Sequence, residues 1–318
     1  MEQVITYTEA VRRNYDPTHT TLLRNMFARD MNSRFNEIIR AIRIGVAKHD
    51  CFGLNPRPHT LQVTPLAEGA FAFARDPAKL AGFLKWLQQQ VDKGLLTVRE
   101  LEQVGTSIEA VWMNLYLYDA YKRGVMRANY EMRKIGMDVP PLDDIGGIGF
   151  VMGLPMHVER LGLIYTRAYT SLKGITDAMG NTISQILAQG LAEGDGMMLL
   201  ARKIVAGIDG TGLGKLGITD RLGRFIPAKR RAEMLARTEI IRAHHLATIQ
   251  EYRNWGVLGI QLKAEWTTAG DDKVCTKCAA LEGKVFTLDQ IEGMIPLHPE
   301  CRCIALPWSE RLLKYETE

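Results

Sequence analysis

The chain has 318 residues, of which 46% are hydrophobic and 24% charged, and its net charge is +4. This length predicts about two domains of roughly 100–200 residues each, and no stretch reaches the roughly 18 uncharged apolar residues of a membrane span. The mild positive charge is well short of that of a dedicated DNA-packaging protein, and it allows weak contact with nucleic acid without arguing for it.

The first predicted element is a helix from Leu22 to Val46. Apolar residues recur there every three or four positions and form one stripe, made of Leu23, Phe27, Met31, Phe35, Ile38, Ile42 and Val46. Between them lie Arg24, Arg29, Arg34, Arg40 and Arg43. We favour a core-facing stripe with a solvated basic face, and the alternative is an arm that contacts phosphate or an acidic partner.

The next segments alternate between turn-rich and helical patterns. Residues 52–75 contain three prolines and short alternating runs, which favour a small β-hairpin. A helix is predicted from Asp76 to Gly94, with Asp76 as its cap and Pro77 in its first turn. The sequence Thr97-Val98-Arg99-Glu100 fits a capping box and predicts another helix, running to about Ile135.

Glycine and proline dominate the segment from Val139 to Pro155, among apolar residues. Such a segment cannot form a regular helix, yet it is too apolar for a solvated linker. We expect a boundary or an extended arm that buries Ile148, Phe150 and Val151 against a neighbour.

Two short helices with a tight turn are predicted next. Asn181 caps the first, which ends at Gly190, and Asp195 caps the second, which ends at Gly207. A plain antiparallel α-hairpin is favoured over a DNA-reading helix-turn-helix, because no side chains suited to base reading stand out on the second helix.

A further helix is predicted from Ala228 to Trp255, and residues 260–266 alternate as a strand. His244 and His245 lie on this helix, where adjacent side chains point in different directions and cannot chelate one ion together. They are interpreted as structural histidines.

Four of the five cysteines lie near the end of the chain, together with one histidine: Cys275, Cys278, His298, Cys301 and Cys303. The residues Met1-Glu2-Gln3 have neither the basic nor the apolar region of a signal peptide, so these thiols are expected to stay reduced in a cytosol, where clustered cysteines more often bind metal. A two-residue gap lets two thiolates reach one ion, and the second group can close a tetrahedral shell.

These five residues are candidate ligands for the four positions of a structural Zn²⁺, and which four hold the metal is left open. Four protein ligands leave no open position for water or substrate, so we predict no catalytic residue here. Reduced cysteines without metal and disulfides are the alternatives. A metal is favoured because the roughly fifty residues from 259 to 308 fall below the ~60 at which a core without staples is marginal.

Several ordered motifs resemble the phage head-morphogenesis family, the minor head proteins similar to protein F of phage Mu. The motifs are Arg237-Thr238-Glu239 on a helix, Tyr252 with Gly256, Trp266, Asp272, Cys275-x-x-Cys278, Leu281-Glu282-Gly283 and His298-Pro299-x-Cys301-Arg302-Cys303, preceded by Gly190-Leu191, Gly194 and Leu200-Ala201-x-x-Ile204. The resemblance covers roughly residues 180 to 308.

This resemblance implies a non-enzymatic virion protein that acts in capsid assembly in the host cytoplasm and in DNA packaging or ejection. Its expected partners are the portal protein and the major capsid protein, with several copies around the portal vertex; packaged DNA is a further candidate and a membrane is not. The alternative is a zinc-scaffolded nucleic-acid-binding protein or an HNH-like nuclease, although no histidine outside the cluster has an Asn or Asp at a spacing that would supply the open metal such hydrolysis needs.

The predicted fold is therefore mainly α, with a small α+β zinc-binding C-terminal module. Four parts are expected along the chain. They are a helical N-terminal domain at 1–137, a Gly/Pro-rich apolar connection or arm with the following helix at 138–180, a helical hairpin and long helix of the head-morphogenesis domain at 181–258, and a zinc-stapled module at 259–318.

Overall fold

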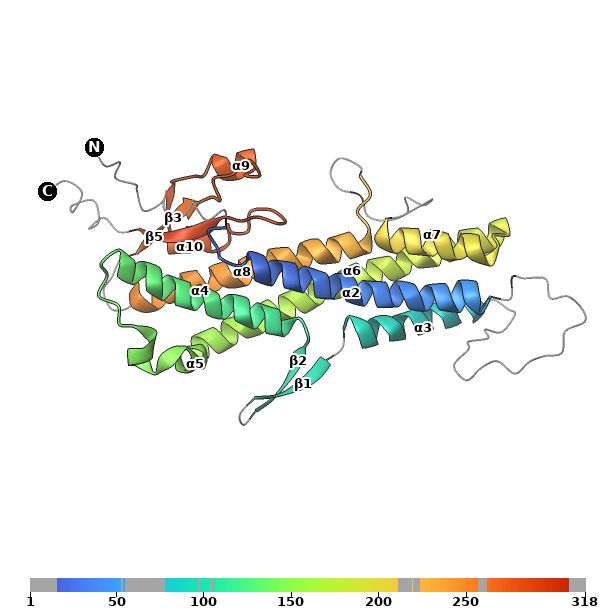
Figure 1. The fold of residues 1–318 in the computed structure, drawn as a ribbon, viewed down its shortest axis with the longest axis horizontal. Coiled ribbons are helices and arrows are strands. Elements are labelled where there is room, and N and C mark those ends of the chain that lie inside the picture. Colours follow the sequence, from blue (N-terminus) through green and yellow to red (C-terminus); the bar gives the residue numbers. More distant parts are fainter. Residues whose placement is uncertain are drawn as a thin grey trace, which may run out of the picture. The chain divides into compact units, whose positions relative to one another are not determined.

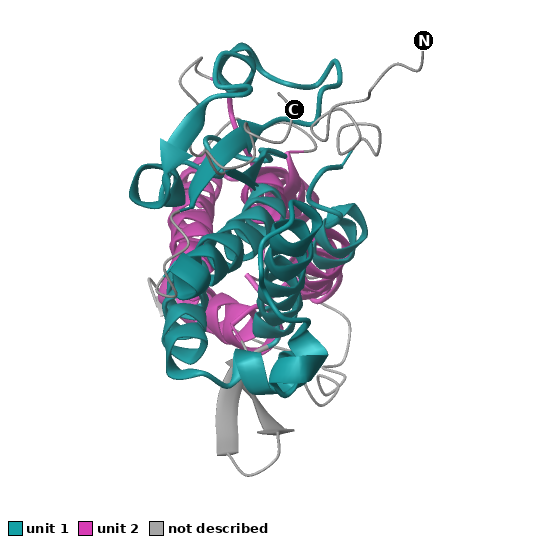
Figure 2. Ribbon diagram, turned by 90° about the vertical axis from the view of Figure 1, so that its left-hand side faces the viewer, with its two compact units in different colours: residues 1–27, 112–168, 234–318 teal, residues 28–111, 169–233 magenta. Residues whose placement is uncertain are grey.

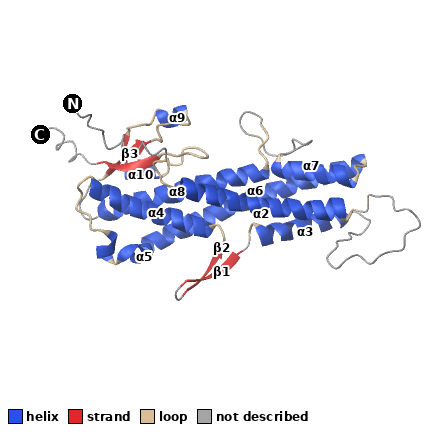
Figure 3. Cartoon of the chain, in the orientation of Figure 1, coloured by secondary structure: helices blue, strands red, loops and turns tan. Residues whose placement is uncertain are grey.

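The computed structural model describes residues 16–52, 54, 78–96, 98–103, 106–210, 219, 224–256 and 262–308. Helices dominate these residues, and the strands belong to one two-stranded ribbon and one three-stranded sheet (Figure 3). The mainly α prediction is thus confirmed. Within the part of the chain that the structure describes, no helix combines the length and the apolar character that a membrane crossing needs.

Contacts divide the chain into two compact units (Figure 2). Unit 1 contains residues 1–27, 112–168 and 234–318, and unit 2 contains residues 28–111 and 169–233. Three helices contribute residues to both units: α2 (Thr21–Arg43), α6 (Pro155–Glu193) and α8 (Ala228–Gly256).

Unit 2 also contains η1 (Ile44–Lys48), α3 (Ala78–Gly94), the ribbon of β1 (Val98–Gln103) and β2 (Thr106–Val111), and α7 (Met197–Asp209). The apolar stripe predicted for the first helix is buried at each of its positions from Leu23 to Val46, and the helix ends in the π-helical turn η1. The predicted end of the next helix at Gly94 is confirmed, whereas its Asp76 cap and the hairpin in 52–75, apart from residues 52 and 54, lie outside the described residues.

The prediction of a helix that begins at Thr97 is wrong for the first half of that segment. Residues 98–111 form an antiparallel pair of strands instead, in which Val98 lies opposite Val111 and Leu101 opposite Ile108. The β-branched residues Val98, Ile108 and Val111 favour strands, which opposes the capping-box pattern. The helical second half is confirmed as α4 (Asn114–Lys134).

The short helix predicted from Asn181 is also wrong, because α6 runs without interruption from Pro155 to Glu193. Its buried stripe continues through Met179 and Ile183 on both sides of Asn181, so packing overrides the local cap signal. The second helix starts after Gly196 rather than Asp195 and ends at Asp209 rather than Gly207.

The predicted α-hairpin is nevertheless present as α6 and α7. A Cβ at Gly190 would lie 2.7 Å from Leu200 Cδ1, and one at Gly207 would lie 2.9 Å from Ile186 Cδ1. Glycine at both positions therefore lets the two helices approach closely.

In unit 1, the Gly/Pro-rich segment folds into the 3-10 turn η2 (Leu142–Ile145) and the short helix α5 (Gly147–Met152), so the prediction that it forms no regular helix is wrong for residues 147–152. Gly146 and Gly147 have left-handed φ values of 95° and 80°, which glycine adopts without steric cost. Val151 is buried as predicted, but Phe150 is 61% exposed, so its predicted burial is wrong.

The remaining elements of unit 1 form the C-terminal module, which lies against α4 and α8 (Figure 1). They are β3 (Lys263–Thr267), α9 (Thr276–Ala279), β4 (Val285–Thr287), α10 (Leu288–Glu292) and β5 (Ile304–Trp308). The predicted helix at 228–255 and the strand ending at Trp266 are thereby confirmed as α8 and β3.

Candidate metal centre

A small antiparallel sheet carries the loops that hold the cysteines. Its strand order is β4-β3-β5, with β3 in the centre and Trp266 opposite Ala305. Trp266 is fully buried and packs in one apolar cluster with Tyr252 of α8 and with Cys278, Cys301 and Cys303. The cysteine-bearing loops are therefore part of the core that joins the module to the helix.

Hydrogen bonds and ion pairs fix the module to the helices around this core. Tyr252 Oη donates to Ala305 O at 3.2 Å, and His245 Nε2 donates to Ile291 O at 3.0 Å. On α10, Glu292 accepts from Arg253 of α8 at 2.9 Å and also from Arg160 of α6. Hydrogen bonds from Arg253, and then from Arg160, lower the pKa of Glu292 to about 2.

His245 and its neighbour His244 are both buried, and burial lowers the pKa of His245 to about 4 and that of His244 to about 3. Both rings are therefore neutral at pH 7. In the described residues, the groups close enough to share an ion comprise the four cysteines and His298, without either of these two histidines. Their interpretation as structural side chains fits this placement.

The first pair of thiols is arranged by a helix start. Cys275 is the N-cap of α9, and its Sγ accepts the backbone N–H of Cys278 at 3.4 Å. Sulfur thus takes the place that an oxygen side chain usually occupies at a helix N-terminus. One helical turn then carries the Cys278 side chain to the same side as Cys275.

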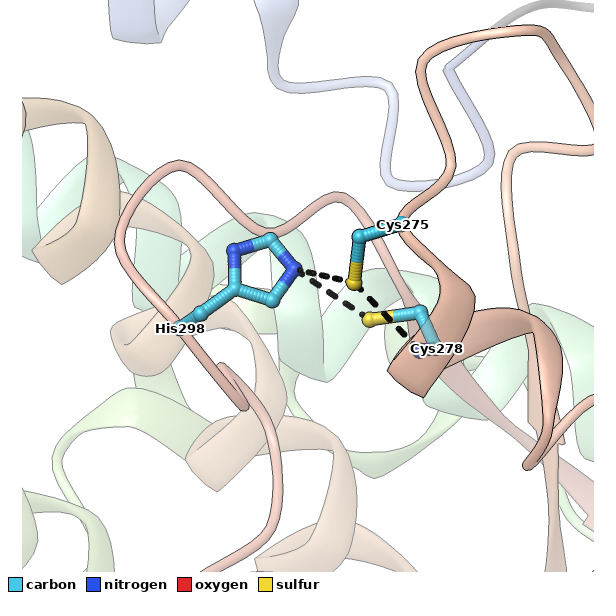
Figure 4. Close-up of side chains that lie close together, drawn as sticks. All are labelled: Cys275, Cys278 and His298. Carbon is cyan, nitrogen blue, oxygen red and sulfur yellow. Dashed lines mark hydrogen bonds between the residues drawn. The ribbon is translucent and has the colours of Figure 1, made fainter. Parts of the chain in front are cut away.

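His298 completes a first group of three. Its Nε2 lies 3.3 Å from Cys275 Sγ and 3.3 Å from Cys278 Sγ (Figure 4). The other ring nitrogen, Nδ1, lies 2.8 Å from Pro299 O, to which it donates. A histidine that gives its Nδ1 proton to a carbonyl presents the Nε2 lone pair, as metal-bound histidines do.

Cys301 and Cys303 form a second group that shares Cys278. The sulfurs of Cys278 and Cys301 are 3.9 Å apart, and all three sulfurs lie within 4.8 Å of one another. A cavity of about 20 Å³ opens between these loops and is lined by Cys275, Cys278, His298 and Cys303, among others. That volume corresponds to about one water-sized sphere.

These distances fit a tetrahedral ion. Bonds of about 2.3 Å to sulfur and about 2.0–2.1 Å to nitrogen place neighbouring ligand atoms roughly 3.5–3.8 Å apart. The separations of 3.3 Å and 3.9 Å around Cys278 lie close to that range. Each group of three could therefore hold a metal ion.

The electrostatics of the cluster divide the four thiols. A hydrogen bond from the Cys303 thiol lowers the pKa of Cys301 and raises that of Cys303, and burial raises the pKa of Cys278 to about 12. The Cys278 N–H lowers the pKa of Cys275. Thiolates are the forms of cysteine that bind metals.

Ion pairing holds the loop that precedes α9. Arg302, between two of the cysteines, donates to both carboxylate oxygens of Asp271 at 2.6 Å each. Sequence reasoning did not identify this pair, because 31 residues separate its members. The five predicted candidates thus form two adjoining groups of three that share Cys278, and the pair of Arg302 and Asp271 lies beside them.

Comparison with known proteins bears on the same part of the chain. Residues 181–306 match a family model described as "Phage Mu protein F like protein". No match was found among curated proteins or among solved structures. The matched residues run from the last turns of α6, through α7 and α8, to the end of the cysteine-bearing module.

Proposed function

We propose that the protein is a structural minor head protein of a tailed phage, because residues 181–306 match the family model of phage Mu protein F-like proteins. It acts in head assembly and remains in the virion. The family match is the observation that carries this proposal. The resemblance of the ordered motifs from Gly190 to Cys303, found from the sequence alone, supports it independently of the fold.

The proposal assigns the cysteine cluster a structural role. Cys275, Cys278 and His298 supply three ligands, and one of Cys301 and Cys303 supplies the fourth. Sulfur and imidazole ligands favour Zn²⁺ over the hard cations that oxygen ligands bind. A closed set of four ligands stabilises the fold and leaves no position for substrate.

The need for such an ion follows from the size of the module. Its five elements lie within 263–308, and several are single turns or strands of three to five residues. A structural Zn²⁺ contributes on the order of 10 kcal/mol to the folding of a small zinc module. The bound ion keeps the loops on both sides of α9 together. The core around Trp266 packs these loops against Tyr252 of α8, so the ion also stabilises the contact between the module and that helix.

The expected partners are the portal protein and the major capsid protein, with several copies of the chain around the portal vertex. Packaged DNA is a further partner, which the protein would contact during DNA packaging or ejection. The other function considered for a zinc-scaffolded chain, nucleic-acid binding or HNH-like nuclease activity, needs an accessible metal or a basic reading surface.

A co-purification experiment separates these functions. The tagged full chain is expressed with the portal protein of the same phage, and the lysate is treated with nuclease before affinity purification. We expect the portal protein to co-purify in the absence of DNA. Loss of that association, together with nuclease activity that a chelator abolishes and added metal restores, would favour the alternative instead.

A further inference from the structure

The loop between two candidate ligands contains a backbone conformation that most residues avoid. Glu300 lies between His298 and Cys301, and its φ is +61°. A side chain with a Cβ is disfavoured in this left-handed region. The tight turn is closed by the N–H of Cys301, which donates to His298 O at 3.2 Å. Something outside the loop must therefore stabilise Glu300.

Two side chains of α8 contact Glu300. Thr238 Oγ1 accepts the backbone N–H of Glu300 at 3.1 Å, and Arg237 Nη1 lies 3.5 Å from Glu300 Oε1. The Thr238 hydroxyl also donates to Met234 O at 2.6 Å. The hydroxyl proton is thus used in the hydrogen bond to Met234 O, and a lone pair of the same oxygen accepts the N–H of Glu300.

This turn determines where both ligands point. His298 precedes Glu300 by two residues and Cys301 follows it directly, and both side chains must face Cys278 for one ion to bind. The carbonyl of Pro299, which orients the His298 ring, belongs to the same turn. A change in the backbone of Glu300 would therefore displace both ligands at once.

We propose that Thr238 and Arg237 are positioning residues of the metal site, which act through Glu300 and touch no ligand atom themselves. The inference rests on the proposed Zn²⁺ and gives two residues of the Arg237-Thr238-Glu239 motif a role at the cysteine cluster. Outer contacts that orient ligands change metal affinity by roughly 10–100-fold. The loss of the Thr238 hydroxyl is expected to fall in that range.

The test uses the full chain and a matched control on the same helix. Thr238→Val keeps the shape of the side chain and removes the acceptor for Glu300. Thr248→Val is the control, because Thr248 Oγ1 also donates to the carbonyl four residues earlier, His244 O, at 3.0 Å, and its other hydrogen bond is to Gly124 O of α4. Zinc affinity is measured by competition with a chromophoric chelator, and the site is monitored by the visible absorption of bound Co²⁺.

We expect Thr238→Val to weaken zinc binding by about 10–100-fold and to alter the cobalt spectrum, while Thr248→Val retains the wild-type affinity and spectrum. Arg237→Gln, a milder change at a half-buried pair, should weaken binding in the same direction. A second substitution, Glu300→Gly, should restore most of the affinity lost in Thr238→Val, since glycine adopts the turn without help.

Wild-type affinity in Thr238→Val, or an equal loss in Thr248→Val, would overturn the positioning role. A wild-type chain that binds no zinc would contradict the proposed metal itself, which is a separate result. If Thr238→Val fails to fold, the comparison of Arg237→Gln with the wild type decides the question.

Discussion

Gly124 of α4 faces the backbone of α8, and its replacement by alanine tests the packing beneath the module. A Cβ at this position would lie 2.3 Å from His244 O and 2.7 Å from Ala247 Cβ. Neither atom belongs to a flexible side-chain end, so the helices must move apart. Overpacking of this kind costs about 1–3 kcal/mol, and the better helix propensity of alanine returns about 1 kcal/mol. We expect the upper part of that cost and a net destabilisation of about 2 kcal/mol.

The assay is urea denaturation of the full chain, followed by far-UV circular dichroism and by tryptophan fluorescence. Gly162→Ala is the matched control, because Gly162 also lies inside a helix of unit 1 and a Cβ there has no neighbour within 4 Å. It should stabilise the protein by about 0.5–1 kcal/mol. Gly124→Ala with the stability of the wild type, or of the control, would refute the close contact of α4 and α8.

Three further predictions concern the module and unit 2. Cys301→Ser and Cys303→Ser should differ, since the variant that removes the fourth ligand lowers both the zinc content and the melting temperature of the module; wild-type zinc content in both variants would mean that neither thiol is required, and an equal loss in both would contradict a single fourth ligand. Glu292→Gln should destabilise the protein by about 1 kcal/mol at pH 7. Because the folded pKa of Glu292 is about 2 against an ordinary value of 4.5, the difference from wild type is fully present above pH 4.5 and should disappear as the pH falls toward 2; a difference independent of pH would contradict the ion pairs. Gly207→Ala should be less stable than Gly174→Ala by about 1 kcal/mol or less, measured by urea denaturation, because a Cβ at Gly174 has open space whereas one at Gly207 would meet the flexible end of Ile186; the helix propensity of alanine acts equally in both variants.

Periodicity predicted well those elements whose buried stripe is regular. The stripe from Leu23 to Val46 is predicted by spacing alone, because burial repeats there with the helical period. In the second half of α8, by contrast, burial is nearly continuous from Ile240 to Tyr252. Local signals failed where tertiary packing opposed them. Asn181 carries a good cap side chain, yet the apolar stripe of α6 continues past it and keeps the helix intact.

The composition of a segment does not predict which of its side chains are buried. Glycines at 146 and 147 do break the chain, but only the fold decides that Phe150 remains exposed while Val151 is buried. Similarly, Arg24 was assigned to a solvated face and is in fact 7% exposed, 3.3 Å from Asp16. Helical spacing shows which residues share a face, and it does not show what the rest of the chain places opposite.

The cysteine cluster was predictable because its chemistry is local. A Cys-x-x-Cys pair needs one helical turn to converge, and α9 provides it. The support from Thr238 was not predictable, since 62 residues separate it from Glu300 and no spacing rule connects them. Its only trace in the sequence is the resemblance of Arg237-Thr238-Glu239 to a motif of the phage head-morphogenesis family.

The protein inventory of purified phage particles tests the proposed function most directly. Particles of the phage that encodes this chain are purified on a density gradient, treated with protease and nuclease, and analysed by quantitative mass spectrometry against the portal and major capsid proteins. We predict that the chain is present in far fewer copies than the major capsid protein and is enriched with the portal. Its absence from mature particles and from assembling heads would contradict a role in the phage head.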